Sequence, residues 1–382
     1  MKVLYHHRIR SKDGQFVHLQ ELVHAFEAGG HVVNLVGPRI LESGEFGEGG
    51  GFSDTLRSKL PKVCFELLEF AYSLLALLRL WAALRKNRPD LIYERFNLFF
   101  PVGVWLANLH KIPIVLEVNG PLLQERSEHG GLSLKWLAGW SQNYVWNNAT
   151  LCLPVTNVLA NYLREVGVSE ERILIIPNGV DFERFAVADR QFVSNKFGWK
   201  DKVVLGFIGF VRPWHGVDSI IMSMAEGKLP ENTRLLVAGD GPALPDLKRM
   251  THQLGLNERV VFTGVVSRED VPNYIAGFDI ALQPSVVAWA SPLKVIEYLA
   301  VGSAIVAPAQ PNIGEILVHE ENALLFDPAK PEDRIKMIVR LVESEPLRKV
   351  LGTNAVTTIS KLSLTWSSNA DRIIARLLSI KS

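Results

Sequence analysis

The chain has 382 residues, of which 48% are hydrophobic and 21% are charged, and its formal net charge is +1 at pH 7. This length exceeds one comfortable hydrophobic core and predicts two domains, while the composition excludes an intrinsically disordered chain. A net charge so close to zero gives no broad electrostatic basis for binding nucleic acid. The two cysteines, Cys64 and Cys152, lie in apolar runs without CxxC spacing, which favours buried thiols in a reducing compartment.

The chain opens with "MKVLYHH", which starts a predicted strand at once, without the charged start and apolar run of a signal peptide. We therefore expect a cytoplasmic protein. The segment that most resembles a membrane span, residues 63–84, is interrupted by Glu66, Glu69 and Arg79. We do not expect it to cross a bilayer.

The first half of the chain alternates predicted strands and helices, which is the pattern of a parallel sheet. A helix is expected near residues 16–28, where Gly29 and Gly30 end it, and others over residues 63–86 and 102–109. The predicted strands are "KVLY", "HVVNLV", "DLIYERF", "IPIVLEV", "LCLPV" and "ILIIP".

A turn-rich break at "NGVDFERF", residues 178–185, precedes a second alternation. Its predicted strands are "VVLGFIG", "RLLVAGDG", "VVFTG", "DIALQ", "SAIVA" and "ALLF". The fold class that we predict is α/β, with two doubly wound, Rossmann-like domains over residues 1–182 and 183–366 that face a central cleft. The last helix, near residues 367–382, is expected to pack on one of the two halves.

The stretch "SPLKVIEYLAVGSAIVAP" has the signals of a short helix followed by a buried strand. Ser291 suits the N-cap and Pro292 the first helical position. Gly302 stands where a left-handed C-terminal cap belongs, and residues 304–307 form a strand that Pro308 stops.

Lys294 falls in the first turn of this helix, where the exposed N–H groups are already positive and a cation costs roughly 0.3–1 kcal/mol. An anion bound at the helix start would make the lysine charge favourable, because the ammonium and the N–H groups would hold the anion together. The alternative is that Lys294 reaches solvent beside an ordinary helix. The loop "GFVRPWHG" ends another strand at the same edge of the sheet and adds Arg212 and His215. Because cations converge there, we expect an anion site, although His215 by itself more often packs or caps.

Glu297 lies one turn after Lys294 on the same helix face, among apolar neighbours. A carboxylate in such a place needs a partner. Paired hydroxyls, such as those of a ribose, could supply it, and an ion pair with Lys294 is the alternative.

The order and spacing of "IPNGVD", "GFIGFVRPWHGVD", "LLVAGDGP" and "SPLKVIEYLAVGSAIVAP" resemble the family-four retaining glycosyltransferases of the GT-B fold. The resemblance covers nearly all of the second domain, and it is looser in the first, where "DGQFVHLQELVHAFEAGGHVV" carries it. It implies transfer of a sugar from a nucleotide-diphosphate donor to an acceptor, with the anomeric configuration retained and neither metal nor cofactor. The second domain would bind the donor, and the first would face the acceptor.

The resemblance also implies roles for single residues. Glu297 would bind the ribose hydroxyls, Gly264 and Val266 would flank the base through their backbone, and Gly14 would face the donor from the first domain. The residues expected at the diphosphate are Ser291, Pro292, Leu293, Lys294, Arg212 and His215.

This chain departs from the family pattern at several of these positions. Trp289 stands where the family has a glutamate that contacts the donor sugar, and Asn119, with Glu117 beside it, where many relatives have a histidine. His215 replaces a usual lysine, and Phe210 a frequent arginine. We place Trp289 among the substrate-binding residues and Asn119 with the catalytic ones.

The expected mechanism uses fixed charges. Lys294, Arg212 and the helix N–H groups would stabilise the negative charge that develops on the leaving diphosphate. No DxD motif stands at a strand end and no His/Cys cluster has the spacing of metal ligands, so we expect no metal. Domain closure would exclude water.

The long helix over residues 63–86 places Glu66, Glu69 and Ser73 on one face, and the same face continues to Leu77, Leu80 and Leu84. The basic residues around its second half are Arg79, Arg85, Lys86 and Arg88. This face either contacts the inner membrane surface or a lipid-linked acceptor, or it is buried against the domain or a second subunit. The later pair Trp136 and Trp140 is expected in the core.

Two other functions share this architecture. A nucleotide-sugar epimerase needs an acid and a base on opposite sides of the sugar, for which His6, His7 and Glu117 are candidates. An inactive donor-binding regulatory subunit is favoured by Trp289. A nicotinamide dehydrogenase should show G-x-G-x-x-G after the first strand, and "HHRIRSKDGQ" lacks it.

Overall fold

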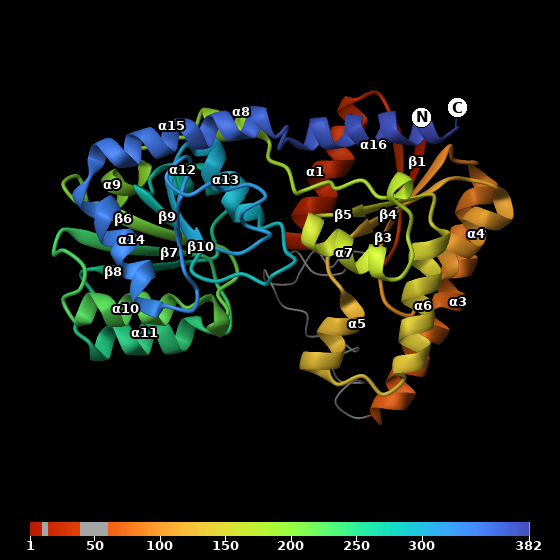
Figure 1. Ribbon diagram of the computed structural model, residues 1–382, viewed down its shortest axis with the longest axis horizontal. Coiled ribbons are helices and arrows are strands. Elements are labelled where there is room, and N and C mark those ends of the chain that lie inside the picture. The colour runs from red at the N-terminus through yellow and green to blue at the C-terminus, as the bar shows by residue number, and fades with distance from the viewer. Residues whose placement is uncertain (10–13, 39–59, 382) are drawn as a thin grey trace. The chain divides into compact units, whose positions relative to one another are not determined.

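The computed structural model describes residues 1–9, 14–38 and 60–381. The chain forms two compact units, one of Met1–Pro177 with Trp366–Ser382 and the other of Asn178–Thr365. Each unit is a parallel sheet covered by helices (Figure 1). The predicted α/β class, with two doubly wound sheets, is confirmed.

The sheet of the first unit has the strand order β2-β1-β3-β4-β5 in its described part. Its strands are β1 (Lys2–His6), β2 (Val32–Val36), β3 (Leu91–Arg95), β4 (Ile114–Val118) and β5 (Leu151–Pro154). Its helices are α1 (Gly14–Ala28), α3 (Lys62–Lys86), α4 (Val102–His110), α5 (Leu122–Glu125), α6 (Lys135–Asn148), α7 (Asn157–Glu165) and α16 (Trp366–Lys381). All the pairings are parallel, and the register sets His6 beside Glu94 and Arg95 beside Glu117.

The last helix, α16, packs on α1 of the first unit. The rings of Trp366 and His18 lie 4.8 Å apart, and Asn369 donates a 2.7 Å hydrogen bond to the carbonyl of Pro177. Ile373 and Leu377 are fully buried. The C-terminal segment therefore completes the core of the unit that the N-terminus begins.

The sheet of the second unit has the order β11-β10-β9-β6-β7-β8. Its strands are β6 (Val203–Ile208), β7 (Thr233–Ala238), β8 (Val260–Gly264), β9 (Ile280–Leu282), β10 (Ala304–Pro308) and β11 (Leu324–Phe326). Its helices are α8 (Phe182–Ala186), α9 (Phe192–Phe197), α10 (Val217–Ala225), α11 (Leu244–Gln253), α12 (Val271–Ala276), α13 (Leu293–Val301), α14 (Pro331–Glu343) and α15 (Glu345–Lys361).

Strand β6 shows why the strands of this sheet are largely apolar. Its six residues are all buried, and alternate side chains enter two separate cores, Val204 and Ile208 on one face and Leu205 and Phe207 on the other. Helices therefore cover both faces, as the doubly wound pattern requires.

Helix α3 decides between the two alternatives for the long helix. Glu66, Ser73, Leu80 and Leu84 are buried, so of the two alternatives for this face, membrane contact or burial against the domain, the structure shows burial. The Glu66 carboxylate accepts the backbone N–H groups of Ser133 and Leu134, at 2.9 and 2.6 Å, just before α6. Exposed leucines cover the opposite face: Leu67, Leu68, Leu74, Leu75 and Leu78.

Two further expectations, one about Cys64 and one about the Trp136/Trp140 pair, are wrong. Cys64 is exposed, while Cys152 is buried as expected, and both are free thiols. Trp136 and Trp140 lie largely outside the core. By length and composition alone α3 is the one helix in the described residues that could cross a membrane, despite its three interrupting charges. Of these charges, Glu66 and Glu69 lie on the inner face, whereas Arg79 is exposed.

Candidate functional site

The loops after β6, β7 and β8 meet at the carboxyl edge of the second sheet. The N–H of Gly209 donates to the carbonyl of Ala238, and the N–H of Gly239 donates to that of Gly264, both at 2.9 Å. Gly239 has a φ of +135°, and a Cβ there would lie 2.1 Å from the Gly209 oxygen. Only glycine allows this approach, so the three loops form one tightly connected floor.

Lys294 lies against this floor. Its Nζ is 3.8 Å from the centroid of the Phe207 ring on β6, and close to Gly209. Burial lowers the pKa of Lys294 to about 7, although the neighbouring Glu297 raises it. A lysine folded back over an aromatic ring in this way does not simply reach into solvent, which favours the anion-site interpretation.

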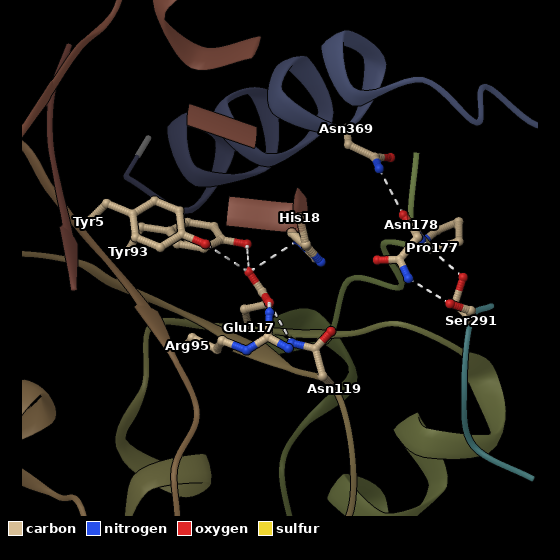
Figure 2. Close-up of polar contacts among 10 residues, drawn as sticks. All are labelled: Tyr5, His18, Tyr93, Arg95, Glu117, Asn119, Pro177, Asn178, Ser291 and Asn369. Atoms are coloured by element: carbon tan, nitrogen blue, oxygen red, sulfur yellow. Dashed lines mark hydrogen bonds and ion pairs between the residues drawn. The ribbon is translucent and has the colours of Figure 1, made fainter. Parts of the chain in front are cut away.

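The start of α13 differs from the prediction. The helix begins at Leu293 with Pro292 as its N-cap residue, so the expected N-cap role of Ser291 is wrong. The Ser291 hydroxyl instead accepts the backbone N–H of Asn178 at 3.0 Å, and its carbonyl accepts the Asn178 side-chain amide at 2.5 Å (Figure 2). Asn178 comes from the "IPNGVD" motif and fixes the loop that leads into α13. Gly302 ends the helix with a φ of +71°, as predicted.

His215 closes the short 3₁₀ turn Pro213–His215 after β6. Its Nδ1 accepts the backbone N–H of Arg212 at 3.0 Å, and the ring lies on Phe207 and Trp214. Burial, with smaller contributions from Lys294 and Arg212, lowers the pKa of His215 to about 3. A neutral ring whose Nδ1 accepts must carry its proton on Nε2, which is therefore a donor.

Arg212 itself is exposed, with its guanidinium 5.1 Å from the centroid of the Phe210 ring. The structure thus brings three of the predicted residues, Arg212, His215 and Lys294, to one edge of the sheet. Glu297 is half-buried one turn further along α13 and lies close enough to affect the pKa of Lys294.

The remaining predicted residues lie as follows. Gly264 ends β8 with a φ of +71°, and Val266, just beyond it, is partly buried against the core. Trp289 is half-buried in the loop between β9 and α13. In the first unit, Gly14 is the exposed first residue of α1, and Asn119 follows β4.

Glu117 is the centre of a buried polar cluster in the first unit (Figure 2). Its carboxylate accepts hydrogen bonds from Tyr93 at 2.9 Å and Tyr5 at 3.2 Å, and it pairs with Arg95 at 2.6 Å and His18 at 3.3 Å. The Asn119 amide also donates to it. Five partners, from β1, α1, β3 and the loop after β4, surround this carboxylate.

Burial by itself raises the pKa of Glu117, but His18 and Arg95, with the hydrogen bonds from Asn119 and Tyr93, lower it further than burial raises it. The group is therefore ionised and fully engaged, which argues against the expected acid–base role in an epimerase. His6 is likewise paired, with Glu94 at 2.5 Å. The partners of Glu117 were missed in the sequence because they are distant along the chain.

Within residues 1–9, 14–38 and 60–381, no group of three or more His, Cys, Asp or Glu side chains is arranged to hold a metal ion.

A doubly wound sheet with cations and glycine-rich loops at its carboxyl edge is an architecture of nucleotide-binding proteins. Profiles of two families match the chain: "Glycosyltransferase Family 4" over residues 12–184 and "Glycosyl transferases group 1" over residues 189–358. The chain therefore belongs to the family-four glycosyltransferases of the GT-B fold.

Among curated proteins, an uncharacterized glycosyltransferase of Methanocaldococcus jannaschii is 27% identical over 228 residues, which cover 59% of this chain and 57% of that protein. A UDP-Gal:alpha-D-GlcNAc-diphosphoundecaprenol alpha-1,3-galactosyltransferase of Escherichia coli is 23% identical over 330 residues, covering 79% of this chain and 81% of that protein. The chain spans about half the length of the first curated relatives that it matches.

Among solved structures, Anabaena Alr3699/HepE in complex with UDP is similar with a TM-score of 0.76 and 18% identity, covering 99% of this chain and all of that one. The same protein has also been crystallised with UDP-glucose. At this identity the likeness establishes the fold.

Proposed function

We propose that this protein is a retaining glycosyltransferase that moves a sugar from a UDP-sugar to an acceptor. The observation that carries the proposal is the position of Lys294, held over Phe207 at the start of α13 beside His215 and Arg212. A pyrophosphate there would meet the N–H groups of the helix start, the ammonium, the guanidinium and the Nε2–H of His215. GDP-sugars remain the competing donor class, and UDP is favoured by its presence in the Anabaena structure.

The other donor contacts follow from the same placement. Glu297, one turn along α13, would accept the ribose hydroxyls, and the chain around Gly264 and Val266 would flank the base. Ser291, Pro292 and Leu293 would present their backbone to the diphosphate. Trp289, in the loop before α13, would border the donor sugar, and Gly14 would face the donor from the first unit.

The proposed chemistry is departure of the nucleoside diphosphate assisted by fixed charge. Lys294, Arg212 and the first N–H groups of α13 stabilise the charge that builds up on the leaving oxygens, so the reaction needs no metal and no other cofactor. Asn119, held by its hydrogen bond to Glu117, is positioned by a rigid buried cluster and would act from the acceptor side.

For the acceptor we propose a glycan carried on a membrane lipid, because the E. coli relative acts on a diphosphoundecaprenol-linked sugar. The two free cysteines support a reducing, cytoplasmic location. The enzyme would then work at the inner face of the membrane, reached through α3.

A regulatory subunit that binds the donor without transferring the sugar is the second candidate, and Trp289 in place of the family glutamate favours it. Incubation with UDP-sugars and GDP-sugars separates the possibilities. Nucleotide release that increases with an acceptor supports transfer, whereas an isomerised sugar supports epimerisation. Binding without turnover supports the regulatory role, and absence of binding contradicts the site itself.

The variants Lys294→Ala and Arg212→Ala test the mechanism. Each should lower kcat by about 100-fold or more, the usual effect of removing a group that stabilises developing charge, while donor affinity falls by less than about tenfold. Arg249→Ala is a matched control, since Arg249 is an exposed arginine of the same unit that pairs with Asp246 on α11. Equal losses in kcat and in affinity would contradict a role in the transition state.

A further inference from the structure

Helix α3 has its charges sorted by sign. Its two carboxylates both face inward: Glu66 is buried and accepts the backbone N–H groups just before α6, and Glu69 pairs with Arg126 at 2.8 Å. Three of its bases, Arg79, Arg85 and Lys86, are exposed, whereas Lys62 lies on the same face as Glu66, with its Nζ close to Gly131. A soluble surface helix normally places its leucines inside and charges of both signs outside. Helix α3 differs, because five of its leucines are exposed and its outward charges are all basic.

The outward face of α3 is apolar along most of its length. Five exposed leucines occupy helical positions from Leu67 to Leu78, and the side chain of Leu78 is 61% exposed. Trp81 continues the row, with the Arg85 guanidinium 3.9 Å above the centroid of its ring. Buried leucines, Leu80 and Leu84, fix the inner side of the same helix, so this orientation cannot rotate without exposing the core.

Helix α6 extends this apolar face. Its start lies close to α3: Glu66 accepts the N–H of Leu134, the residue before α6, and the rings of Phe70 and Trp140 lie 6.3 Å apart. Trp136 at its first turn is 72% exposed, next to the exposed Lys135. Exposed tryptophans and basic residues around a row of leucines are the composition of a protein surface that enters the headgroup region of a bilayer.

We propose that this α3–α6 face, made of Leu67, Leu68, Leu74, Leu75, Leu78, Trp81, Trp136 and Trp140 with the outward bases of α3, docks on an anionic lipid bilayer. The helix lies in the interface plane and does not cross the membrane. Crossing would strip Glu66 and Ser73 from their buried places in the unit. The inference extends the proposed function, because it names the surface through which the enzyme would reach a lipid-linked acceptor.

Charge decides between a bilayer and a second copy of the chain. Three bases of α3, Arg79, Arg85 and Lys86, face outward and neither of its carboxylates does, so two copies meeting through this face would bring like charges together. Anionic headgroups would instead neutralise the same bases. The leucines gain from burial in either case, so the bases determine the partner.

Vesicle flotation of the full chain tests the proposal, with phosphatidylcholine alone and with phosphatidylcholine mixed with phosphatidylglycerol. We expect the protein to float with the anionic vesicles and less with the neutral ones. Leu74→Glu/Leu78→Glu should lower the bound fraction by roughly tenfold or more. Trp136→Ser should also lower the bound fraction, which tests the contribution of α6. Val187→Glu/Val318→Glu, at two exposed apolar positions in the other unit, is the matched control and should leave flotation unchanged.

Three results would overturn the docking surface: no flotation with anionic vesicles, flotation that survives Leu74→Glu/Leu78→Glu, or a stable dimer that this variant converts to monomer. Thermal unfolding of each variant, with and without UDP, shows that the fold and the donor site are intact. If UDP raises the unfolding temperature but the protein does not float, only the proposed membrane surface is contradicted. Flotation without UDP stabilisation contradicts the proposed function alone.

Discussion

At the scale of single residues, Lys294 and Glu117 show two opposite ways of burying a charge. Glu117 is surrounded by donors, so its folded-state pKa lies below its ordinary value of 4.5 and its charge stabilises the fold at neutral pH. That stability is lost as the pH falls through the folded pKa. Lys294 is buried over an aromatic ring, and its pKa falls from 10.5 to about 7.

Because the pKa of Lys294 is lowered, its charged form destabilises the folded protein when no ligand is bound. Between pH 7 and 10.5 the unfolded chain binds more protons at this position than the folded one, so the contribution of Lys294 to stability rises with pH across that window. Below pH 7 the full cost of the buried ammonium is present. An anion at the site would remove this cost, which links binding to protonation.

We therefore predict that UDP binding takes up a proton above pH 7 and weakens as the pH rises. Bound diphosphate favours the ammonium form of Lys294, so its pKa rises on binding. Affinity should fall by about three- to tenfold between pH 7 and pH 9, towards the affinity of Lys294→Ala. Isothermal titration in two buffers of different ionisation enthalpy measures both the affinity and the proton uptake.

Lys294→Ala is the control in that experiment, because it should bind UDP with little dependence on pH across the same range. A wild-type profile as flat as that of the variant would show that Lys294 does not contact the diphosphate.

At the scale of elements, the site depends on loops that touch one another through their backbones. Gly239 and Gly209 approach more closely than any side chain would allow, and Asn178 ties the loop before α13 to a segment more than one hundred residues earlier. The three loops are held by the edge of the sheet rather than by their own sequences. A disturbance in one loop therefore reaches the others.

We predict that Gly239→Ala destabilises the second unit by more than about 2 kcal/mol and abolishes measurable UDP binding. Its φ of +135° is unfavourable for alanine, and the added Cβ would lie 2.1 Å from the Gly209 oxygen. Chemical denaturation followed by tryptophan fluorescence measures the stability, and thermal shift measures UDP binding.

Gly227→Ala separates backbone conformation from crowding. Gly227 also has a positive φ, +70°, but nothing lies within 4 Å of the position of its Cβ. It should cost only about 1–2 kcal/mol and leave UDP binding intact. Similar losses for both variants would contradict the close packing of the loops.

At the scale of the whole molecule, the chain begins and ends in the same unit. Residues 178–365 form one continuous unit, whereas the other is assembled from Met1–Pro177 and the returning helix α16. Helix α16 buries Trp366, Ile373 and Leu377, and it also hydrogen-bonds through Asn369 to the end of the N-terminal segment. The first unit is therefore incomplete until the last helix of the chain is made.

We predict that truncation after Thr365 destabilises the first unit and leaves the second one folded. Three large buried side chains would be lost, each contributing about 1.5–3 kcal/mol, and the face of α1 that α16 covers would be exposed. Calorimetry should show a lowered or absent transition for the first unit and an unchanged, UDP-sensitive transition for the second.

Truncation after Leu378 removes only the last four residues, Ser379–Ser382, and should leave both transitions in place. If removal of the whole helix changes neither transition, α16 contributes nothing to the stability of the first unit.

The sequence by itself determined both parallel sheets, the left-handed cap at Gly302, and the sheet edge that carries Lys294, Arg212 and His215. It also determined the order of the strands, except that the predicted strand "ILIIP" forms none. These features follow from local periodicity, from turn residues, and from the rule that parallel strands present their carboxyl ends together. Only the tertiary structure decided which face of α3 is buried, why Ser291 is not an N-cap, and which five groups surround Glu117. Each of these depends on a partner distant in the sequence: Ser133 for Glu66, Asn178 for Ser291, and Tyr5 and Tyr93 for Glu117. A polar side chain is buried or exposed according to whether such a partner reaches it, and periodicity carries no information about that.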